Sequence, residues 1–461
     1  MSSAVPSARA FERLVDELAR EVGGRAAVSW AHATALAKHA ADHGLIESVG
    51  GAPGPDSTRR ALDALAGSHP ALAPLADPQV VALWERPISR GDWEAAARFW
   101  ETASLADDGY RVDGYRLGDA YQALSADARK NRALCQTPPW VADLLLELSV
   151  VPAADEVGAD EIRMIDPSCG TGHVLLAAFH RLRVHQPRGR ATRAPVSRQR
   201  SLERALQAVH GVELDNYAAM VARYRLLATT AAILDVPIAR VPAQWPVQVA
   251  AADTLLDAEE PLLQPGTYHA VVGNPPYITP RDAKLREAVR RAYPEVCSGK
   301  YSLALPFSVL MTRLAKPAGR VTQLTANSFM KREFGRRFIE QYLPQLDLEW
   351  VIDTSGCYIP GHGTPTVILS WRHRKPQRRT VTTIQGNRGE PRVPDNPARG
   401  LVWRAIEEAV HERLAYDRLL RGLEAQQRAY EVASPSRLCN SMSHCIVVSV
   451  AGSPARTESS P

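Results

Sequence analysis

The segment Asn274-Pro275-Pro276-Tyr277 combines residue types that can act on an amino group. Asn274 ends the apolar run HAVVGN, and the two prolines after it restrict the backbone to a rigid, extended turn. The Asn274 side chain and the Pro275 carbonyl group are two fixed acceptors for amino hydrogens, and they would return the delocalised lone pair of an aryl amine to nitrogen. The Tyr277 ring can stack on a base turned out of a duplex, and such stacking contributes roughly 1–3 kcal/mol to binding. The segment therefore predicts rigidly aligned group transfer to a base amino group; a Pro-rich turn after a strand is the alternative.

The segment Asp166-Pro167-Ser168-Cys169-Gly170-Thr171-Gly172 is a candidate ligand-binding loop between the strand IRMID and a helix. Gly170 and Gly172 allow a tight turn and a close backbone approach, and the helix N-terminus supplies free amides. Asp166 and Glu213 each end a strand, where a carboxylate can hold ribose hydroxyls. The loop lacks the full GxGxxG pattern and the P-loop lysine, which favours a ligand without a pyrophosphate. A structural turn with a buried acid is the alternative.

These sites require an open, mostly parallel sheet with helices on both faces, and residues 131–372 have that pattern. The β-rich segments IRMID, VHGVEL, HAVVGN, RVTQLTAN, WVID and TVILSW are interspersed with helical ones. Asp253 follows another possible strand, QVAAAD, where it can meet an adenine amino group or simply end a loop. Residues 1–130 predict a helical N-terminal region, and 373–432 predict a basic linker and one long helix. Residues 433–461 lack periodicity and are expected to be a disordered tail.

The composition is that of an ordinary globular protein, with 45% hydrophobic and 23% charged residues among 461. The net charge of +5 is compatible with a nucleic-acid partner but does not demonstrate one. The six cysteines are scattered without a CxxC pair, which argues against a metal site and for a reducing compartment. The N-terminus has no apolar signal core and no apolar run reaches membrane-spanning length, so we expect a cytoplasmic protein without a metal.

The order of three motifs resembles that of adenine-specific DNA methyltransferases of restriction and phage-exclusion systems. Gln136-Thr137-Pro138-Pro139-Trp140-Val141 comes first, DPSCGTG follows, and NPPY comes later. The stretches NPPYITPRDAKLREAVRRAYPEV, KYSLALPF, TANSFMKREFG and VIDTSGCYIPGHGTPTVIL are similar to the PglX-like proteins of bacteriophage-exclusion (BREX) systems. The resemblance covers residues 130–372 strongly, the N-terminal helices weakly and the end of the chain not at all.

The resemblance implies a Rossmann-like fold that uses S-adenosyl-L-methionine to methylate the N6 amino group of adenine in DNA, in host DNA modification and phage defence. The residues that would hold the cofactor are Thr137 and Pro138 at its methionine end, Asp166 and Gly170 at its amino-acid moiety, Glu213 at the ribose and Asp253 at the adenine ring. Gly172 belongs to the same cofactor-binding loop. Asn274, Pro275, Pro276 and Tyr277 would hold the target base. The implied partners are double-stranded DNA with a flipped adenine and other phage-exclusion or specificity subunits.

Basic and aromatic residues are further candidates for DNA contact. The side chains that can bind phosphates, or simply form a solvated basic surface, are Lys331, Arg332, Arg336 and Arg337. The basic insertion at 186–201 is expected on the surface. Tyr301, Phe329 and Phe334 could either line a pocket for the target base or pack in the core, and the sequence favours neither role. Packing between helices is expected for Trp84, Trp93, Trp100 and Tyr110.

Two other functions are alternatives. A protein glutamine methyltransferase also uses NPPY, because a carboxamide nitrogen needs the same two acceptors, but the TPPWV segment and the chain length argue against it. A catalytically weak or inactive DNA-binding or scaffold subunit would be expected to lack Asn274 or the loop glycines, and all are present. Base reading needs several rigidly placed side chains. With one helix and a patternless ending after residue 372, we expect this chain alone to methylate poorly or unselectively. Either a partner supplies recognition, or the chain is a C-terminally truncated family member.

Overall fold

The N-terminal region of the protein is helical, as expected. The computed structural model describes residues 8–47, 50, 52–102, 113–125, 136–185, 197–360, 363–377, 380–386, 389–433 and 448–450. The N-terminal helices are α1 (Ala8–Val22), α2 (Gly24–Asp42), α3 (Pro55–Ser68), α4 (Arg90–Thr102) and α5 (Tyr115–Leu124). Trp100 is fully buried among them, and Trp84 and Trp93 pack partly buried against the same core. These three tryptophans therefore pack between helices as predicted, and Tyr110 lies outside the described residues.

One sheet forms the centre of the molecule, with strand order β3-β2-β1-β4-β5-β7-β6-β8-β9. The strands are β1 (Met164–Asp166), β2 (Val209–Glu213), β3 (Gln248–Ala251), β4 (Tyr268–Gly273), β5 (Ala315–Ala326), β6 (Asp347–Asp353), β7 (Thr366–Arg372), β8 (Thr382–Gly386) and β9 (Val448–Val450). Strand β7 runs antiparallel to both β5 and β6, and the other pairings are parallel. The order in which successive strands are added to the sheet reverses between the parallel neighbours β1 and β4, and such a switch point is where open α/β sheets bind ligands.

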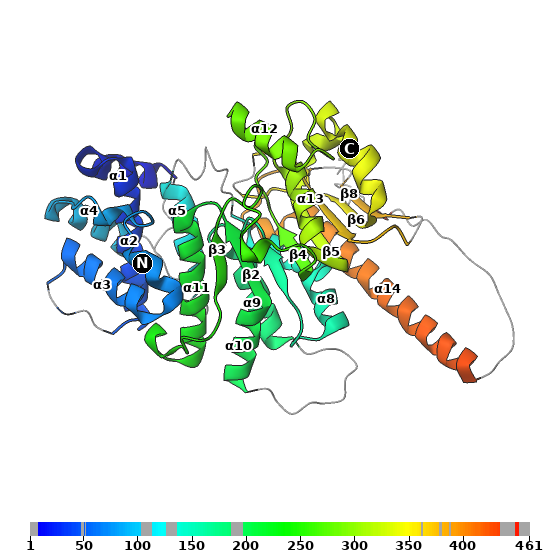
Figure 1. The fold of residues 1–461 in the computed structure, drawn as a ribbon, viewed down its shortest axis with the longest axis horizontal. Helices are drawn as coiled ribbons and strands as arrows, with labels where there is room; N and C mark the ends of the chain where they lie inside the picture. The colour runs from blue at the N-terminus through cyan, green and yellow to red at the C-terminus, as the bar shows by residue number, and fades with distance from the viewer. Residues whose placement is uncertain are drawn as a thin grey trace, which may run out of the picture.

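Helices cover both faces of the sheet, because alternate residues of its buried strands point to opposite sides. The helices after the N-terminal region are α7 (Pro139–Leu148), α8 (Val150–Val157), α9 (His173–Val184), α10 (Arg198–Ala208), α11 (Asn216–Leu234), α12 (Ala283–Ala292), α13 (Ala304–Leu314) and α14 (Leu401–Ala433). In β4, Ala270 and Val272 face the core that includes α7, α9 and α11, whereas Val271 faces the core under α13. Figure 1 shows the N-terminal helices beside α11, at the β3 end of the sheet.

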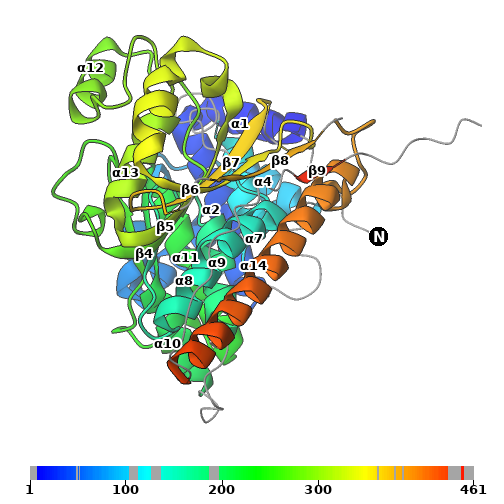
Figure 2. The same cartoon turned by 90° about the vertical axis from the view of Figure 1, so that its right-hand side faces the viewer.

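The segment interpreted as a linker contains a strand. β8 pairs in parallel with β6, and Ile384 is its buried apolar residue. A single apolar residue among polar neighbours is a weak local signal, so the strand depends on pairing with the sheet. The long helix expected from residue 401 is α14, whose Ile406 and Val410 are buried; Figure 2 shows it running along α7. Trp403 meets Trp140 of α7 with ring centroids 4.3 Å apart.

Two searches of the described residues concern other classes of site. None of the helices within the described ranges is long and apolar enough to cross a membrane. In the same residues no group of three or more His, Cys, Asp or Glu side chains is arranged to hold a metal ion.

Candidate active site

The DPSCGTG loop joins β1 to α9 at the switch point of the sheet. Asp166 ends β1, and its Oδ1 accepts a hydrogen bond of 3.0 Å from the Ser168 amide. Gly170 and Gly172 both have positive φ, 54° and 87°, a backbone region that glycine enters without strain. A Cβ on Gly172 would also lie 3.1 Å from the Cβ of Ala222 on α11, so this glycine allows the close approach of loop and helix.

A second carboxylate, which belongs to β2, forms a hydrogen bond with the same loop. Glu213 Oε2 accepts a hydrogen bond of 2.9 Å from the Gly170 amide, and its Oε1 accepts one of 2.9 Å from the Asp215 amide. Burial raises the pKa of Asp166 to about 7, and the charge of Glu213 adds to this rise while the Ser168 hydrogen bonds oppose it. The two acids therefore lie close together in a poorly solvated site, which suits a ligand that brings donors or positive charge.

Asp253 comes shortly after the end of β3. Its Oδ1 accepts hydrogen bonds from the amides of Leu255 and Leu256, at 3.1 and 3.2 Å. These bonds fix the turn, and Asp253 lines the same cavity as Asp166 and Glu213.

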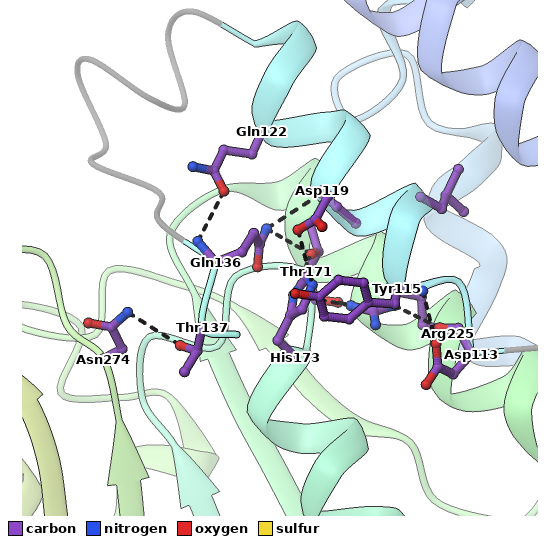
Figure 3. Close-up of polar contacts among 12 residues, drawn as sticks. Asp113, Tyr115, Asp119, Gln122, Gln136, Thr137, Thr171, His173, Arg225 and Asn274 are labelled. Atoms are coloured by element: carbon purple, nitrogen blue, oxygen red, sulfur yellow. Dashed lines mark hydrogen bonds and ion pairs between the residues drawn. The ribbon is translucent and has the colours of Figure 1, made fainter. Parts of the chain in front are cut away.

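The NPPY segment begins directly after β4. Asn274 Nδ2 donates a hydrogen bond of 3.3 Å to Thr137 Oγ1, a contact drawn in Figure 3, and Asn274 Oδ1 accepts one from the Tyr277 hydroxyl. A Cβ on Gly273 would lie 3.1 Å from Asp166 Oδ1, so the end of β4 passes very close to the acid of β1. The side-chain amide of Asn274 therefore lies beside the start of the loop, where Asp166 is placed.

A cavity of about 530 Å³ brings most of the predicted site residues together. The predicted residues that line it are Thr137, Asp166, Gly170, Glu213, Asp253, Asn274 and Pro276. The predicted residues outside its lining are Pro138, which precedes α7, Gly172, which packs on α11, and Pro275 and Tyr277 in the NPPY turn.

Sequence reasoning missed several residues of the cavity wall. These are chiefly Gln136, His173, Leu214, Leu285, Leu303 and Phe307. Gln136 and Leu214 adjoin the motif residues Thr137 and Glu213, so their position in the chain was a usable signal. Leu303 and Phe307 belong to the start of α13, and only the packing of that helix over the sheet brings them to the cavity.

The other aromatic candidates belong to the core. Tyr301 is fully buried, and its hydroxyl donates a hydrogen bond of 2.5 Å to the Arg286 carbonyl oxygen. Phe329 is buried against Phe338 with ring centroids 5.3 Å apart, and Phe334 packs against the same core. None of the three lines the cavity described above.

The four basic candidates lie in short helical turns after β5, and they differ in their partners. Arg336 forms ion pairs with Glu333 at 3.7 Å and with Glu340 at 3.0 Å. Arg337 donates a hydrogen bond of 3.4 Å to the Pro294 carbonyl oxygen. Lys331 and Arg332 are exposed and form no ion pair with a described residue. The basic insertion lies mostly at 186–196, outside the described residues.

Comparison with protein families and curated proteins confirms the resemblance found in the sequence. Residues 207–358 match the family "Eco57I restriction-modification methylase". The chain is 39% identical over 384 residues to the adenine-specific methyltransferase PglX of Streptomyces coelicolor, a match that covers 71% of this chain. The chain spans 31% of the length of that relative.

Two solved structures of protein–DNA complexes share the fold. The type IIL enzyme MmeI in complex with DNA has a TM-score of 0.55 at 16% identity, covering 85% of this chain and 60% of that one. The DrdV–DNA complex has a TM-score of 0.52 at 15% identity, covering 81% and 39%. The predicted methyltransferase-type α/β fold with a helical N-terminal region is thereby confirmed.

Proposed function

We propose that this chain is an S-adenosyl-L-methionine-dependent methyltransferase that modifies the N6 amino group of adenine in DNA. The observation that carries the proposal is the placement of the Asn274 amide in one cavity with the carboxylates of Asp166 and Glu213. A rigid acceptor beside a ligand-binding loop is what transfer to an aryl amine requires. The match to a restriction-modification methylase family and the identity to an adenine-specific methyltransferase support this reading.

The residues of the cavity fit S-adenosyl-L-methionine. Its volume of about 530 Å³ lies within the usual range for small-ligand pockets. The Glu213 carboxylate can accept from ribose hydroxyls, and Asp166 can accept from an ammonium group. Thr137 lines the same cavity and accepts a hydrogen bond from Asn274. We propose that Pro138 and Gly172 serve the site by setting the backbone on either side of it, and that Asp253 accepts from the adenine amino group.

The chain's own residues would prepare the target nitrogen. The cofactor, when bound, supplies an electrophilic methyl group on a sulfonium. The Asn274 side-chain oxygen and the Pro275 carbonyl oxygen accept the two amino hydrogens, which localises the lone pair on nitrogen. Pro276 keeps the turn rigid, and the Tyr277 ring stacks on the extruded base. Formation of the N–C bond would accompany cleavage of the sulfur–methyl bond, whose electron pair stays on sulfur, and the nitrogen would lose one of its amino protons to solvent.

Other parts of the chain would support the catalytic domain and bind DNA. We propose that residues 131–372 form the catalytic domain, with 1–130 as the helical region and 373–432 extending it through β8 and α14. Lys331 and Arg332, together with Arg336 and Arg337, would contact phosphates. From the resemblance of its motifs to PglX-like proteins of bacteriophage-exclusion systems, we propose that the chain modifies host DNA in phage defence in the cytoplasm, together with other exclusion or specificity subunits.

The direct test is methyl transfer by the purified chain from labelled S-adenosyl-L-methionine to double-stranded DNA, followed by digestion and identification of the modified nucleoside. N6-methyladenine is the expected product, and Asn274→Ala is the control that should not form it. Label in protein but not in DNA would instead indicate a protein glutamine methyltransferase. Tight DNA binding with no label in either would indicate a scaffold subunit.

A further inference from the structure

Helix α5 of the N-terminal region approaches the DPSCGTG loop more closely than any side chain at Gly118 would allow. A Cβ at this position would lie 2.5 Å from Thr171 Oγ1 and 2.9 Å from both Arg225 Nη1 and His173 Cε1. Glycine inside a helix costs roughly 1 kcal/mol relative to alanine. By contrast, a Cβ on Gly67 in α3 would meet nothing within 4 Å. A glycine is therefore required at position 118 by the close packing of α5 on the loop, whereas no neighbouring atom requires one at position 67.

A buried arginine joins the start of α5 to the loop. Arg225 of α11 is 1% exposed, and its Nη1 donates a hydrogen bond of 2.7 Å to the Thr171 carbonyl oxygen. Its Nε donates a hydrogen bond of 2.8 Å to the carbonyl oxygen of Asp113, two residues before α5. Removing such a partner from a buried charge is strongly unfavourable, so the arginine couples the two segments.

His173 makes a second connection at the start of α9. Its ring packs edge-on against Tyr115 with centroids 4.5 Å apart, and its Nε2 lies 3.4 Å from Asp119 Oδ1. Both partners belong to α5, and Figure 3 shows them on the helix side of the loop. His173 also lines the cavity, so this contact reaches the ligand site directly.

Gln136 makes the third connection, and it leads to the NPPY segment. Its Nε2 donates a hydrogen bond of 2.9 Å to Thr171 Oγ1, and its backbone amide donates one of 3.0 Å to Gln122 Oε1 on α5. The next residue, Thr137, accepts the hydrogen bond of 3.3 Å from Asn274. A continuous set of polar contacts therefore runs from α5 to the amide proposed for catalysis (Figure 3).

We infer that α5 positions the ligand-binding loop, with Gly118, Arg225 and Gln136 as positioning residues, so that the N-terminal region is part of the cofactor site. The identity of the ligand rests on the proposed function, but the positioning of the loop does not. A separate DNA-binding module loosely joined to the catalytic domain would leave the loop insensitive to changes in α5.

The test measures amide hydrogen exchange in the full chain without ligand, comparing wild type, Gly118→Ala and the matched helix control Gly67→Ala. The loop amides have defined acceptors. The Cys169 amide donates a hydrogen bond of 3.1 Å to the Val212 carbonyl oxygen, and the Gly172 amide donates one of 2.9 Å to the Cys169 carbonyl oxygen. Gly118→Ala should accelerate exchange at 168–172 by about tenfold or more, while β5 and β7 keep wild-type protection. Gly67→Ala should change neither region.

Gln136→Met serves as a second variant, because it keeps the length of the side chain and removes the donor. It should accelerate the same loop amides and weaken S-adenosyl-L-methionine binding in calorimetry by about tenfold. If the loop is equally protected in Gly118→Ala and Gln136→Met, the inference is wrong, whatever the wild type binds. If both variants loosen the loop but wild type binds no cofactor, the positioning stands and the proposed function fails. If Gly118→Ala does not fold, Gln136→Met decides alone.

Discussion

Asn274 uses both polar atoms of its side chain in this structure. Its nitrogen donates to Thr137 Oγ1, and its oxygen accepts from the Tyr277 hydroxyl. The hydrogen bond to Thr137 orients the Asn274 amide so that its oxygen faces Tyr277 of the NPPY turn. A base amino group that binds this oxygen must displace the tyrosine hydroxyl or share the oxygen with it.

Asn274→Ala should abolish most methylation while leaving cofactor affinity nearly unchanged, because the amide acts on the target nitrogen rather than on the ligand. Loss of one preorganised contact typically lowers the rate by about 100- to 1,000-fold. Tyr277→Phe is the matched comparison, since it removes the competing hydroxyl and keeps the stacking ring. It should retain activity within about tenfold. Single-turnover rates and calorimetric Kd values check both; an Asn274→Ala enzyme with half the wild-type rate would contradict the role.

Asp166 should make cofactor binding depend on pH near neutrality. Burial raises its pKa from the ordinary value of 3.8 to about 7 in the folded protein. A ligand ammonium group needs the ionised carboxylate, so affinity should rise about tenfold between pH 6 and pH 8 as the ionised fraction grows. Asp166→Asn should bind weakly at both pH values. Calorimetric Kd values with no pH dependence in wild type would show that this carboxylate does not meet a cation.

The same shift predicts a stability effect with the opposite sign. The folded state holds the Asp166 proton more tightly than the unfolded state, so stability is lost as pH rises from the unfolded pKa through about 7. Asp166→Asn resembles the protonated form, and its gain in Tm over wild type should be larger at pH 8 than at pH 5. Thermal unfolding followed by circular dichroism measures this difference.

At the scale of elements, the short turns after β5 present basic side chains in two different states. Arg336 has two glutamate partners in the turns, whereas Lys331 and Arg332 have none among the described residues. Surface ion pairs contribute little to stability, but they reduce the charge available to a phosphate.

Lys331→Gln and Arg332→Gln should therefore weaken DNA binding more than Arg336→Gln does. Each lost phosphate contact should lower the slope of log affinity against log salt concentration by about 1. Fluorescence anisotropy with a short duplex at several salt concentrations gives these slopes. Equal slopes for wild type, Lys331→Gln and Arg332→Gln would place the DNA on another surface.

At the scale of the whole molecule, two buried histidines join the N-terminal helices to α11. His32 of α2 contacts the Tyr217 hydroxyl at 2.8 Å and the Leu117 carbonyl oxygen at 2.9 Å. His39 contacts the Tyr224 hydroxyl at 2.8 Å. Burial lowers the pKa of His32 to about 4 and that of His39 to about 3. Both side chains are therefore neutral in the folded protein at neutral pH.

Acid should consequently destabilise the packing between the N-terminal helices and α11. The unfolded state binds the histidine protons from pH 6.5 downward, whereas the folded state excludes them until about pH 4, so stability falls as pH falls through this window. For His32 the loss is on the order of 2 kcal/mol at pH 5. Urea unfolding of wild type and His32→Gln at pH 7 and pH 5 tests this. His32→Gln should lose less stability on acidification, and an equal loss would contradict the assignment.

The sequence by itself determined the chemistry-bearing motifs and the strands that carry them. Apolar runs ending in Asp166, Glu213 or Asn274 are local patterns, and parallel strands bring their carboxyl ends to one edge of a sheet. The burial of α11 also has a signal in the sequence. YAAMVARYRLLATTAAIL is apolar around the whole helix, as expected for a helix packed on all sides.

Only the tertiary structure decided which residues support the site. Thr137 meets Asn274 across 137 residues of chain, and Gly118, His173 and Arg225 meet only because α5 packs on α11 and the loop. Nothing local marks these residues, since a helical glycine or arginine has the same sequence context on a surface as in a contact. The strand β8 likewise forms because β6 offers a free edge. Such choices depend on packing between distant segments, which short-range patterns do not encode.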